Sequence, residues 1–291
     1  MRPVLVIHAG AGPRSQWRAQ REPQMRGALL DAVDRGRAVL ERPGGMAIDA
    51  VQAAIQYMED ECEFFNAGRG AALCADGTVE MSAAMMRGSD RAAGAAALVR
   101  RTRQPIALAR AVLEHSPHVL IAGHATDELA ARHGLEQREP SYFVTDHQLG
   151  RLAQAGSDFE RGTVGAVCLD AQGELIAGTS TGGRRGQMPG RVGDTPLIGA
   201  GTWADAQVAI SCTGEGEAFI RAAAAHQLAV RLAAGASLAQ AAADTLQDIA
   251  TVDGVGGLIA VDAEGDLAMP FTTDVMNRAV WRAGETPAAW V

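Results

Sequence analysis

The stretch Gly162-Thr163-Val164-Gly165-Ala166-Val167-Cys168-Leu169-Asp170 decides the fold of this chain. Residues 164–169 are apolar apart from one glycine, a pattern typical of a strand buried on both faces. Ala171-Gln172-Gly173 then indicates a turn, and residues 174–179 predict a second strand. We therefore expect a buried sheet whose first strand in this half of the chain begins at Thr163.

Outward from this strand, short apolar runs alternate with helical patterns. Further strands are predicted at residues 4–7, 119–121, 208–211, 256–261 and 266–271, and an Asp-Gly turn at 76–77 predicts a hairpin between two short strands. Helices are predicted at 24–41, 46–58, 105–114, 127–133, 217–232 and 238–249. The polar residues 136–162 show no period and indicate a linker or mobile loop. Helices covering a mixed sheet are the expected architecture.

Composition limits the class of protein and its partners. The chain has 291 residues, 47% of them apolar, with 34 glycines and a net charge of −8, which fits a folded chain of one large or two ordinary domains. The acidic balance argues against nucleic acid or an anionic membrane as the main partner. The start MRPVLVIHAG carries no secretory pattern, so a cytoplasmic protein is expected. The cysteines at 62, 74, 168 and 212 form no C-x-x-C pair and are expected to be free thiols.

Common catalytic templates are missing from the sequence. No phosphate-binding G-x-x-x-x-G-K-[ST] is present, and Gly214-Glu215-Gly216 lacks the third glycine of a dinucleotide fingerprint, where Phe219 stands. The histidines form no H-E-x-x-H, and no G-x-S-x-G elbow occurs. A nucleophile must therefore come from elsewhere if the chain is an enzyme.

The junction Gly162-Thr163 offers such a nucleophile. Cleavage of this peptide bond would place a free α-amine beside the threonine hydroxyl, so that one residue supplies both nucleophile and base. The alternative is an ordinary threonine at the start of a strand, where this residue type is common.

A second candidate feature lies at Thr213 and Gly214, between a predicted strand and a predicted helix. A threonine hydroxyl and backbone N–H groups at this point could stabilise an oxyanion. The alternative is that Thr213 simply caps the helix.

Several motifs, in this order and spacing, resemble the plant-type asparaginase and isoaspartyl peptidase family of N-terminal nucleophile hydrolases. In the second half they are Gly162-Thr163-Val164-Gly165-Ala166-Val167, Thr179-Ser180-Thr181-Gly182-Gly183, Pro189-Gly190-Arg191-Val192-Gly193-Asp194 and Ser211-Cys212-Thr213-Gly214-Glu215-Gly216-Glu217. In the first half they are His8-Ala9-Gly10-Ala11-Gly12, Phe65-Asn66-Ala67-Gly68 and Ser116-Pro117-His118-Val119. The similarity covers nearly the whole chain except about residues 140–160.

The resemblance implies an α+β fold, a four-layer αββα sandwich of the N-terminal nucleophile hydrolase type. It implies a single domain of residues 1–291 that cleaves itself between Gly162 and Thr163. The products would be an alpha subunit of residues 1–162, with a flexible linker at about 136–162, and a beta subunit of residues 163–291. A dimer of cleaved protomers, a heterotetramer, is expected from the resemblance.

The resemblance also implies roles for individual residues. They are Thr163 as nucleophile, Thr181 as its hydrogen-bond partner, Thr213 and Gly214 as oxyanion hole, Arg191 for the substrate α-carboxylate, Asp194 for its α-ammonium, Gly216 in the pocket and Asn66 supporting the nucleophile. Without the resemblance, Arg191 and Asp194 would be interpreted as a surface ion pair.

The implied activity is hydrolysis of the side-chain amide of L-asparagine and of the isopeptide bond of β-aspartyl dipeptides. No cofactor and no catalytic metal are implied, although backbone carbonyls of the loop that begins at Glu59 and ends at Arg69 could hold a structural sodium ion. Two alternatives remain: a glycosylasparagine amidase of the same fold, or an unprocessed paralogue that binds aspartyl ligands without turnover.

The sequence departs from the family pattern at three positions. Ser82 stands where relatives usually carry aspartate, and Arg69 brings a cation to an apolar position of the ion loop. Glu215 beside the oxyanion hole either points into the pocket or faces solvent and caps the helix. The segment before Thr163 is also shorter than in many relatives, which would slow or alter self-cleavage.

Overall fold

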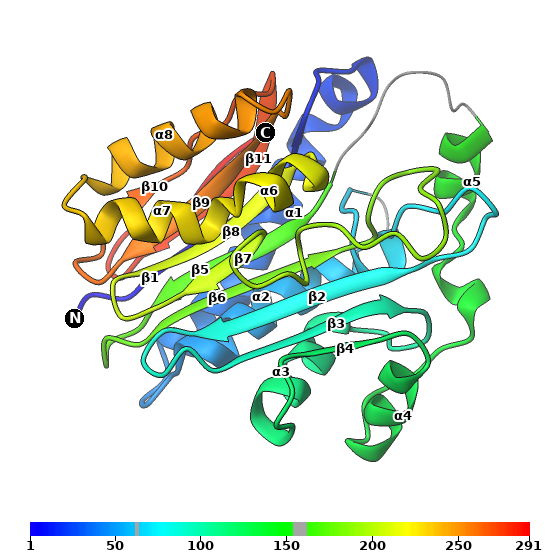
Figure 1. Ribbon diagram of the computed structural model, residues 1–291, viewed down its shortest axis with the longest axis horizontal. Coiled ribbons are helices and arrows are strands. Elements are labelled where there is room, and N and C mark those ends of the chain that lie inside the picture. Colours follow the sequence, from blue (N-terminus) through cyan, green and yellow to red (C-terminus); the bar gives the residue numbers. More distant parts are fainter. Residues whose placement is uncertain (62–63, 154–161) are drawn as a thin grey trace.

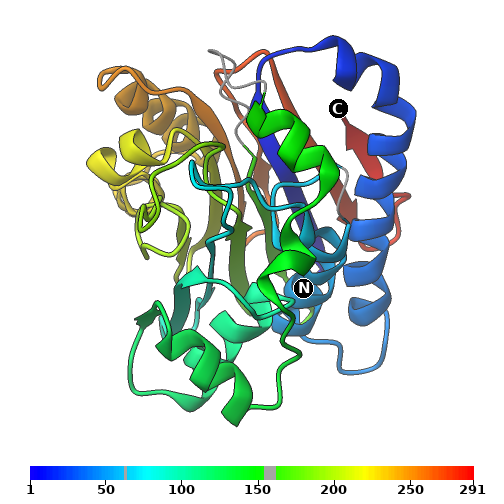
Figure 2. The same cartoon turned by 90° about the vertical axis from the view of Figure 1, so that its right-hand side faces the viewer.

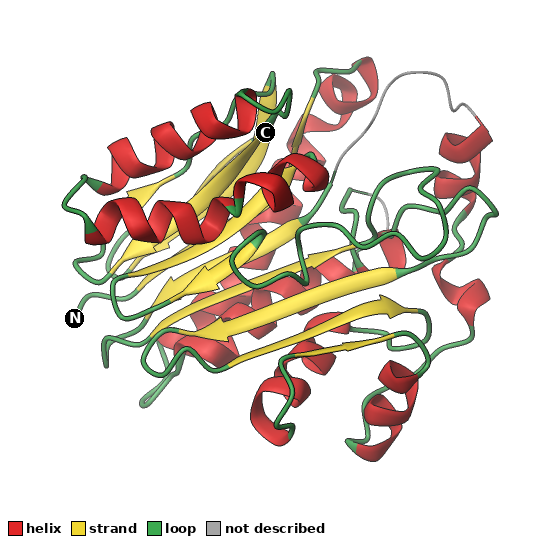
Figure 3. Cartoon of the chain, viewed as in Figure 1, coloured by secondary structure: helices red, strands yellow, loops and turns green. Residues whose placement is uncertain are grey.

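The computed structural model describes residues 1–61, 64–153 and 162–291. The strands of these residues form an eight-stranded and a four-stranded sheet that lie face to face, with helices on the outer side of each (Figures 1 and 3). Paired strands run antiparallel except for one parallel pair, β3 and β4. The prediction of α-helices covering mixed rather than all-parallel sheets is confirmed.

Neighbouring strands are hydrogen-bonded in the following order across each sheet. The large sheet contains β12 (Ala288–Trp290), β11 (Val275–Arg282), β1 (Val4–Gly12), β5 (Val164–Leu169), β6 (Leu175–Thr181), β2 (Met81–Arg87), β3 (Ala93–Val99) and β4 (Leu120–Ala122). The small sheet contains β10 (Leu267–Ala268), β9 (Gly256–Asp262), β8 (Val208–Gly214) and β7 (Thr202–Ala204). The strand that opens at Thr163 is therefore central, between β1 and β6.

Alternate residues of β5 face opposite layers, as the period of a strand requires. Val164, Ala166 and Cys168 pack with the helices on the outer face of the large sheet. Val167 and Leu169 pack between the two sheets. The unbroken apolar pattern of this strand is explained by burial on both sides.

Helices cover the two outer faces (Figure 2). The helices of the described residues are α1 (Gln16–Leu40), α2 (Ala47–Asp60), α3 (Pro105–His115), α4 (Ala125–Arg132), α5 (Asp146–Ala153), α6 (Gly216–Ala222), α7 (Ala224–Ala233) and α8 (Leu238–Ala250), with 3-10 turns at Gly68–Gly70 and Pro140–Phe143. Helices α1, α2 and α3 share an apolar cluster with the large sheet, and α7 and α8 share one with β8 and β9. No helix in the described ranges is long and apolar enough to cross a membrane.

The helix predicted at 217–232 is interrupted. It forms α6 and α7, joined at Ala223, whose φ is 47°. The backbone N–H groups of Ala225 and His226 bond the carbonyls of Ala200 and Gly199 at 3.1 and 2.9 Å. Bonds to another part of the fold thus replace helical bonds, and no local sequence pattern reports them.

The first long helix starts earlier than the apolar pattern predicts. Helix α1 begins at Gln16, where the Ser15 side chain accepts a bond from the Arg18 N–H, and Pro23 lies inside the helix. Its first two turns are mainly polar and mostly exposed, so they carry no hydrophobic period.

The predicted hairpin around residues 76–77 is wrong in part. The turn is present, with the Gly77 N–H bonded to the Cys74 carbonyl at 2.9 Å. The Cys74 N–H also bonds the Thr78 carbonyl across this turn at 2.8 Å. Cys74, however, belongs to an isolated bridge with Gln187 and not to a strand, and the next strand begins at Met81. The strand β3, which pairs with β2, was not predicted because its AGAAALV sequence carries no β-branched run.

The segment predicted as a linker at 136–162 is partly ordered. It contains the 3-10 turn Pro140–Phe143 and helix α5, and Phe143 is completely buried. Residues 154–161 of this segment lie outside the described residues, as does Cys62. Cys74, Cys168 and Cys212 are buried free thiols.

Candidate functional site

Neighbouring strands of the large sheet bring Thr163 and Thr181 together. Thr163 directly precedes β5, and Thr181 is the last residue of β6. Both side chains are almost completely buried, and the Thr163 hydroxyl donates to the Thr181 Oγ1 at 3.2 Å. The Gly183 N–H donates to the same Thr181 oxygen at 3.0 Å, which leaves the Thr181 proton available for another acceptor.

That acceptor is the carbonyl oxygen of Gly162, the residue before Thr163. It receives the Thr181 hydroxyl at 3.1 Å and the Asn66 Nδ2 at 2.7 Å. Asn66 is fixed in turn, because its Nδ2 also donates to the Gly183 carbonyl and its Oδ1 accepts from the Ala72 N–H, both at 2.7 Å. A carbonyl that carries two donors is polarised and prepared for negative charge on its oxygen.

These contacts define what the cluster can do chemically. The Thr163 hydroxyl lies next to the carbonyl of the preceding residue, and the Thr181 hydroxyl touches both. A proton can therefore pass from Thr163 through Thr181 to the Gly162 oxygen. A side chain on Gly162 would meet Asn66, since its Cβ would lie 2.6 Å from the Asn66 Cβ.

A shallow pocket opens beside Thr163. Its wall also contains Arg191, Asp194 and Gly216, so the pocket has a hydroxyl cluster and a guanidinium–carboxylate pair in the same lining. Gly216 is required here because a Cβ would stand 2.8 Å from both the Arg191 Nη2 and the Asp194 Oδ1. The lining suits a small molecule that carries both an anionic and a cationic group.

Asp194 is a buried carboxylate, and its Oδ2 has no hydrogen-bond partner among the described residues. Only 6% of the residue is exposed. Burial raises the pKa of Asp194 to about 6, while the nearby Arg191 charge acts in the opposite direction. An ammonium group bound at this oxygen would offset the desolvation of the carboxylate.

Arg191 forms its ion pair with Glu217 rather than with Asp194. Its Nε and Nη2 each lie 3.0 Å from a Glu217 oxygen, and its Nη1 bonds the Gln187 Oε1 at 3.3 Å. Because Asp194 is buried and Glu217 holds the guanidinium, the alternative of a surface ion pair between Arg191 and Asp194 is wrong. The two-point contact fixes the plane of the guanidinium.

Thr213 lies inside β8 and does not cap a helix. The cap of α6 is Glu215, so the alternative interpretation of Thr213 is wrong. The Thr213 hydroxyl is buried, and no partner for it is found among the described residues. Gly214 follows it with φ 152° and lines the pocket. An unsatisfied hydroxyl next to the pocket wall is suited to accept or donate a bond when a ligand binds.

A buried polar chain behind the site was not predicted. His8 bonds the Ser211 Oγ at 2.9 Å, Ser211 meets the Thr179 Oγ1 at 2.7 Å, and the Thr202 hydroxyl donates to Thr179 at 2.7 Å. Burial lowers the pKa of His8 to about 3, so its ring is neutral. These residues come from β1, β6, β7 and β8, and the only sequence signal is that each hydroxyl or imidazole interrupts an apolar strand.

The three departures from the family pattern have different surroundings. Ser82 is buried in β2 opposite Thr181. Arg69 is exposed, and its guanidinium carbon lies 4.9 Å from the centre of the Tyr142 ring, so it points away from the loop interior. Glu215 is half-buried, forms no side-chain cap bond to α6 and is not among the described residues that line the pocket.

The loop of residues 59–69 is described except for residues 62–63. The carbonyl oxygens of Phe65 and Glu61 lie 2.0 and 3.2 Å from the point where a Gly70 Cβ would stand. These distances leave no room for a side chain at residue 70, and the structural sodium ion stays a prediction. No group of three or more His, Cys, Asp or Glu side chains that could hold a metal is found in the described ranges.

Comparisons with known proteins agree on one family. The model of a family described as asparaginase matches residues 1–290. An isoaspartyl peptidase of Escherichia coli is 42% identical over 308 aligned residues, which cover 99% of this chain and 95% of that protein. Isoaspartyl peptidase/L-asparaginases of Bos taurus and Homo sapiens are 38% and 37% identical, each over 98% of this chain and 95% of the relative.

Proposed function

The chain belongs to the asparaginase family, and we propose that it is a self-processing hydrolase of L-asparagine and β-aspartyl dipeptides. The observation that carries the proposal is the Gly162 carbonyl, which accepts bonds from Asn66 and Thr181 beside the Thr163 hydroxyl. We also assign the fold to the N-terminal nucleophile hydrolase type, a four-layer αββα sandwich. The two face-to-face sheets with outer helices support that assignment.

Self-cleavage would proceed by an N-to-O acyl shift. The Thr163 Oγ attacks the Gly162 carbonyl carbon, and its proton passes through the Thr181 hydroxyl to the carbonyl oxygen. Asn66 stabilises the charge that develops on that oxygen. Collapse of the intermediate moves that proton from the Gly162 oxygen to the Thr163 nitrogen and breaks the Gly162–Thr163 amide bond, and water then hydrolyses the ester. The products are residues 1–162, with a new carboxylate, and residues 163–291, with a new amine.

The new α-amine of Thr163 would be the base of the hydrolytic reaction. It takes the proton of its own hydroxyl as the Thr163 Oγ attacks the side-chain amide carbon of the substrate. Thr213 and Gly214 hold the oxyanion, consistent with the unsatisfied Thr213 hydroxyl. The amine returns the proton to the leaving nitrogen, and water hydrolyses the aspartyl ester that remains.

Substrate recognition would use the opposite charges in the pocket. Arg191, held in plane by Glu217, presents its remaining N–H groups to the α-carboxylate. The buried Asp194 pairs with the α-ammonium, and Gly216 leaves room for the aspartyl backbone. Both charges of an aspartyl zwitterion are then compensated. A ligand without an α-carboxylate and an α-ammonium could not form these two contacts.

We assign no cofactor to the reaction. A sodium ion held by backbone carbonyls of the loop from Glu59 to Arg69 would have a structural role only, and no chemical step involves it. We further propose that two cleaved protomers assemble into a dimer, as the resemblance to the family implies.

Denaturing electrophoresis and two substrates test the proposal. The purified protein is expected to give two bands, with Thr163 at the amino terminus of the smaller one. It should release ammonia from L-asparagine and leucine from β-aspartyl-leucine. Thr163→Ala should give one full-length band and no activity. A wild-type chain that stays intact and inactive would support a non-catalytic paralogue instead.

A further inference from the structure

The buried polar chain of His8, Ser211, Thr179 and Thr202 has no role in the reaction proposed above. Residues two positions apart on a strand point to the same face. Counted in this way along β5, β6 and β8, the residues that share a face with the hydroxyls of Thr163, Thr181 and Thr213 are Gly165, Thr179 and Ser211. The polar chain therefore forms the layer directly behind those hydroxyls, in the space between the two sheets.

Strand pairing brings the members of this layer into line. In the large sheet His8 of β1 pairs with Gly165 of β5, which pairs with Thr179 of β6. In the small sheet Ser211 of β8 pairs with Thr202 of β7. A Cβ on Gly165 would stand 2.0 Å from the Ser211 Oγ and 2.4 Å from the His8 Nε2. Glycine at this position of β5 is what allows side chains of the two sheets to meet above it.

The hydroxyls of the chain have a defined direction of donation. Thr179 Oγ1 accepts from Thr202, and it lies 2.7 Å from the Ser211 Oγ but 3.5 Å from the Gly201 carbonyl. A hydroxyl has one proton, so Thr179 donates its proton to Ser211. Ser211 then donates to the Nε2 of the neutral His8 ring at 2.9 Å. Ser211 of the small sheet is thus bonded to two strands of the large sheet, β6 and β1.

Thr213 depends on this layer because its own side chain is not anchored. No partner of its buried hydroxyl is found among the described residues. Backbone pairing with β7 and β9 holds β8 within the small sheet. Those bonds do not set the distance from β8 to β5, which belongs to the other sheet. The completely buried Ser211 side chain bonds across that gap two residues before Thr213.

Behind the polar layer the contact between the sheets is apolar. The residues two further positions along β5, β6 and β8 are Val167, Ala177 and Ala209, which belong to one buried cluster. Apolar contacts have no preferred direction, whereas a hydrogen bond between two hydroxyls holds their oxygens at about 2.5–3.0 Å. The bonds of Ser211 therefore constrain the gap between the sheets more closely than this apolar layer does.

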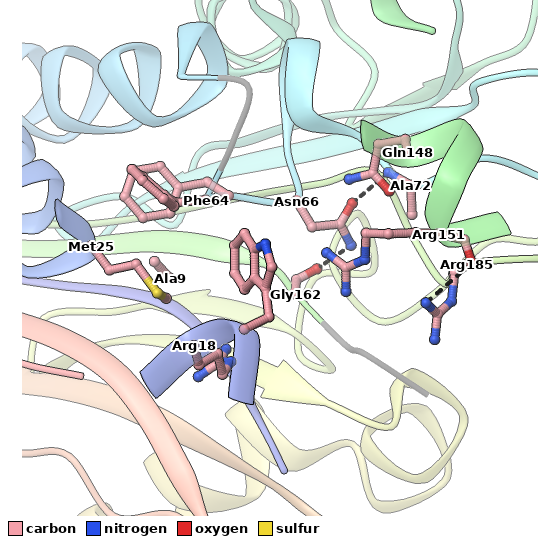
Figure 4. Close-up of a pocket in the computed structure, with 12 residues that line it drawn as sticks. Ala9, Arg18, Met25, Phe64, Asn66, Ala72, Gln148, Arg151, Gly162 and Arg185 are labelled. Atoms are coloured by element: carbon pink, nitrogen blue, oxygen red, sulfur yellow. Dashed lines mark hydrogen bonds between the residues drawn. The ribbon is translucent and has the colours of Figure 1, made fainter. Parts of the chain in front are cut away.

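The groups proposed for self-cleavage lie on another side of Thr163. Figure 4 shows Asn66 beside the Gly162 carbonyl, in a cavity that has residues of α1 and α5 in its lining. Among the described residues, this cavity at Gly162 and the pocket beside Thr163 share only Gly162, and Gly214 belongs to the pocket alone. The oxyanion of self-cleavage and the oxyanion of substrate hydrolysis therefore have different donors.

We propose that Ser211 is a positioning residue for hydrolysis. Its bonds to the large sheet fix the gap between the sheets, and with it the distance from the oxyanion donor Thr213 to the Thr163 Oγ. Ser211 is not among the described residues of the pocket wall, so it acts through Thr213. The inference rests on the proposed function, and it separates the two reactions of the chain. Self-cleavage, whose oxyanion has the donors Asn66 and Thr181, does not require Ser211.

Ser211→Ala tests this role, because it removes the bonds with little change in volume. The kcat for L-asparagine, counted per cleaved chain, should fall about tenfold, since a displaced oxyanion donor loses part of the roughly 10²- to 10³-fold effect of a whole one. The KM should stay within about twofold of wild type, since Arg191 and Asp194 still hold the substrate. The rate of self-cleavage, followed from a labelled pulse, should stay within about threefold.

Two variants of Thr179 test the same bond from its other end. Thr179→Val removes the hydroxyl and keeps the shape, so it should also lower kcat about tenfold. Thr179→Ser keeps the hydroxyl and removes a methyl group, which should lower the Tm but leave kcat within about twofold of wild type. A purely structural role would instead make kcat follow the Tm of the variants.

Thr245→Val is the matched control. Thr245 is also completely buried, and its hydroxyl donates to the Ala241 carbonyl at 2.8 Å within α8, on the outer side of the small sheet. Loss of this bond should lower the Tm, as in Ser211→Ala, and leave both kcat and the rate of self-cleavage unchanged.

Several results would contradict the positioning role and leave the proposed function intact. They are an unchanged kcat in Ser211→Ala, an equal loss of hydrolysis and self-cleavage in that variant, or a loss of kcat in Thr179→Ser or Thr245→Val as large as in Thr179→Val. If Ser211→Ala does not fold, the two Thr179 variants decide the question. A wild-type chain that neither cleaves itself nor hydrolyses asparagine would refute the proposed function itself.

Discussion

Replacing Asn66 by alanine tests whether the Gly162 carbonyl is activated for self-cleavage. Asn66 supplies the shorter of the two bonds to that oxygen, 2.7 Å against 3.1 Å from Thr181. Loss of one preorganised donor to a developing oxyanion costs about 3 kcal/mol, or roughly 10² to 10³ in rate. We therefore expect Asn66→Ala to slow self-cleavage by about two orders of magnitude.

The assay must begin with uncleaved chains. A labelled pulse in cell-free translation followed by a chase, read by denaturing electrophoresis, gives the rate at which the full-length band becomes residues 1–162 and 163–291. Asn66→Ala also removes bonds to Gly183 and Ala72, which lowers stability by about 1 kcal/mol each. Thermal unfolding of each variant separates that loss from the effect on cleavage.

Gln148→Ala is the matched control. Gln148 is a buried amide that donates to the Gly70 carbonyl at 2.7 Å and lines the same cavity as Asn66. Gln148→Ala should lower the free energy of unfolding by about as much per lost hydrogen bond as Asn66→Ala does. It should change the cleavage rate by less than about threefold. Cleavage of Asn66→Ala at the rate of Gln148→Ala would refute the role assigned to the Asn66 amide.

Three further predictions concern substrate binding and packing. Because burial raises the pKa of Asp194 to about 6 and only its anion pairs with an ammonium, KM for asparagine should rise about tenfold per pH unit below that value. A profile that stays flat down to about pH 5 would contradict this role. Glu217→Gln should raise KM for asparagine about three- to tenfold with little change in kcat, since it loosens Arg191. A lower KM would instead mean that Glu217 competes with the substrate carboxylate. Gly165→Ala should lower stability by about 1–3 kcal/mol, because its Cβ would stand 2.4 Å from the His8 Nε2, and an unchanged Tm would be inconsistent with that packing.

The central strands could be predicted from sequence because burial on both faces imposes an apolar run. Strand β5 was predicted to within a residue, and the turn after it is present. Strand β3 was missed because alanine and glycine give no strand signal, although β2 on one side and β4 on the other require a strand there. The break at Ala223 was missed because its cause is a pair of bonds to Gly199 and Ala200. Local patterns report burial better than they report contacts with distant loops.

Sequence motifs likewise indicated some residues of the candidate site but not the contacts between distant ones. Thr163, Thr181 and Arg191 were found because each lies in a short linear motif. Glu217 stands in such a motif too, but its contact with Arg191 could not be predicted, since the two residues are 26 positions apart and meet only when the loop before β7 folds against α6. The cavity at Gly162 had no linear signal at all. Its arginines come from α1, α5 and the loop after β6.

The net charge of the chain and the cations of the pocket have opposite signs. The net charge is −8, yet Arg184 and Arg191 both line the pocket beside Thr163. The two guanidinium groups lie 3.6 and 3.0 Å from the carboxylate of Glu217. A substrate carboxylate that reaches Arg191 therefore meets a guanidinium that already has one counter-charge, so its binding depends on the geometry of the remaining N–H groups rather than on the net charge of the chain.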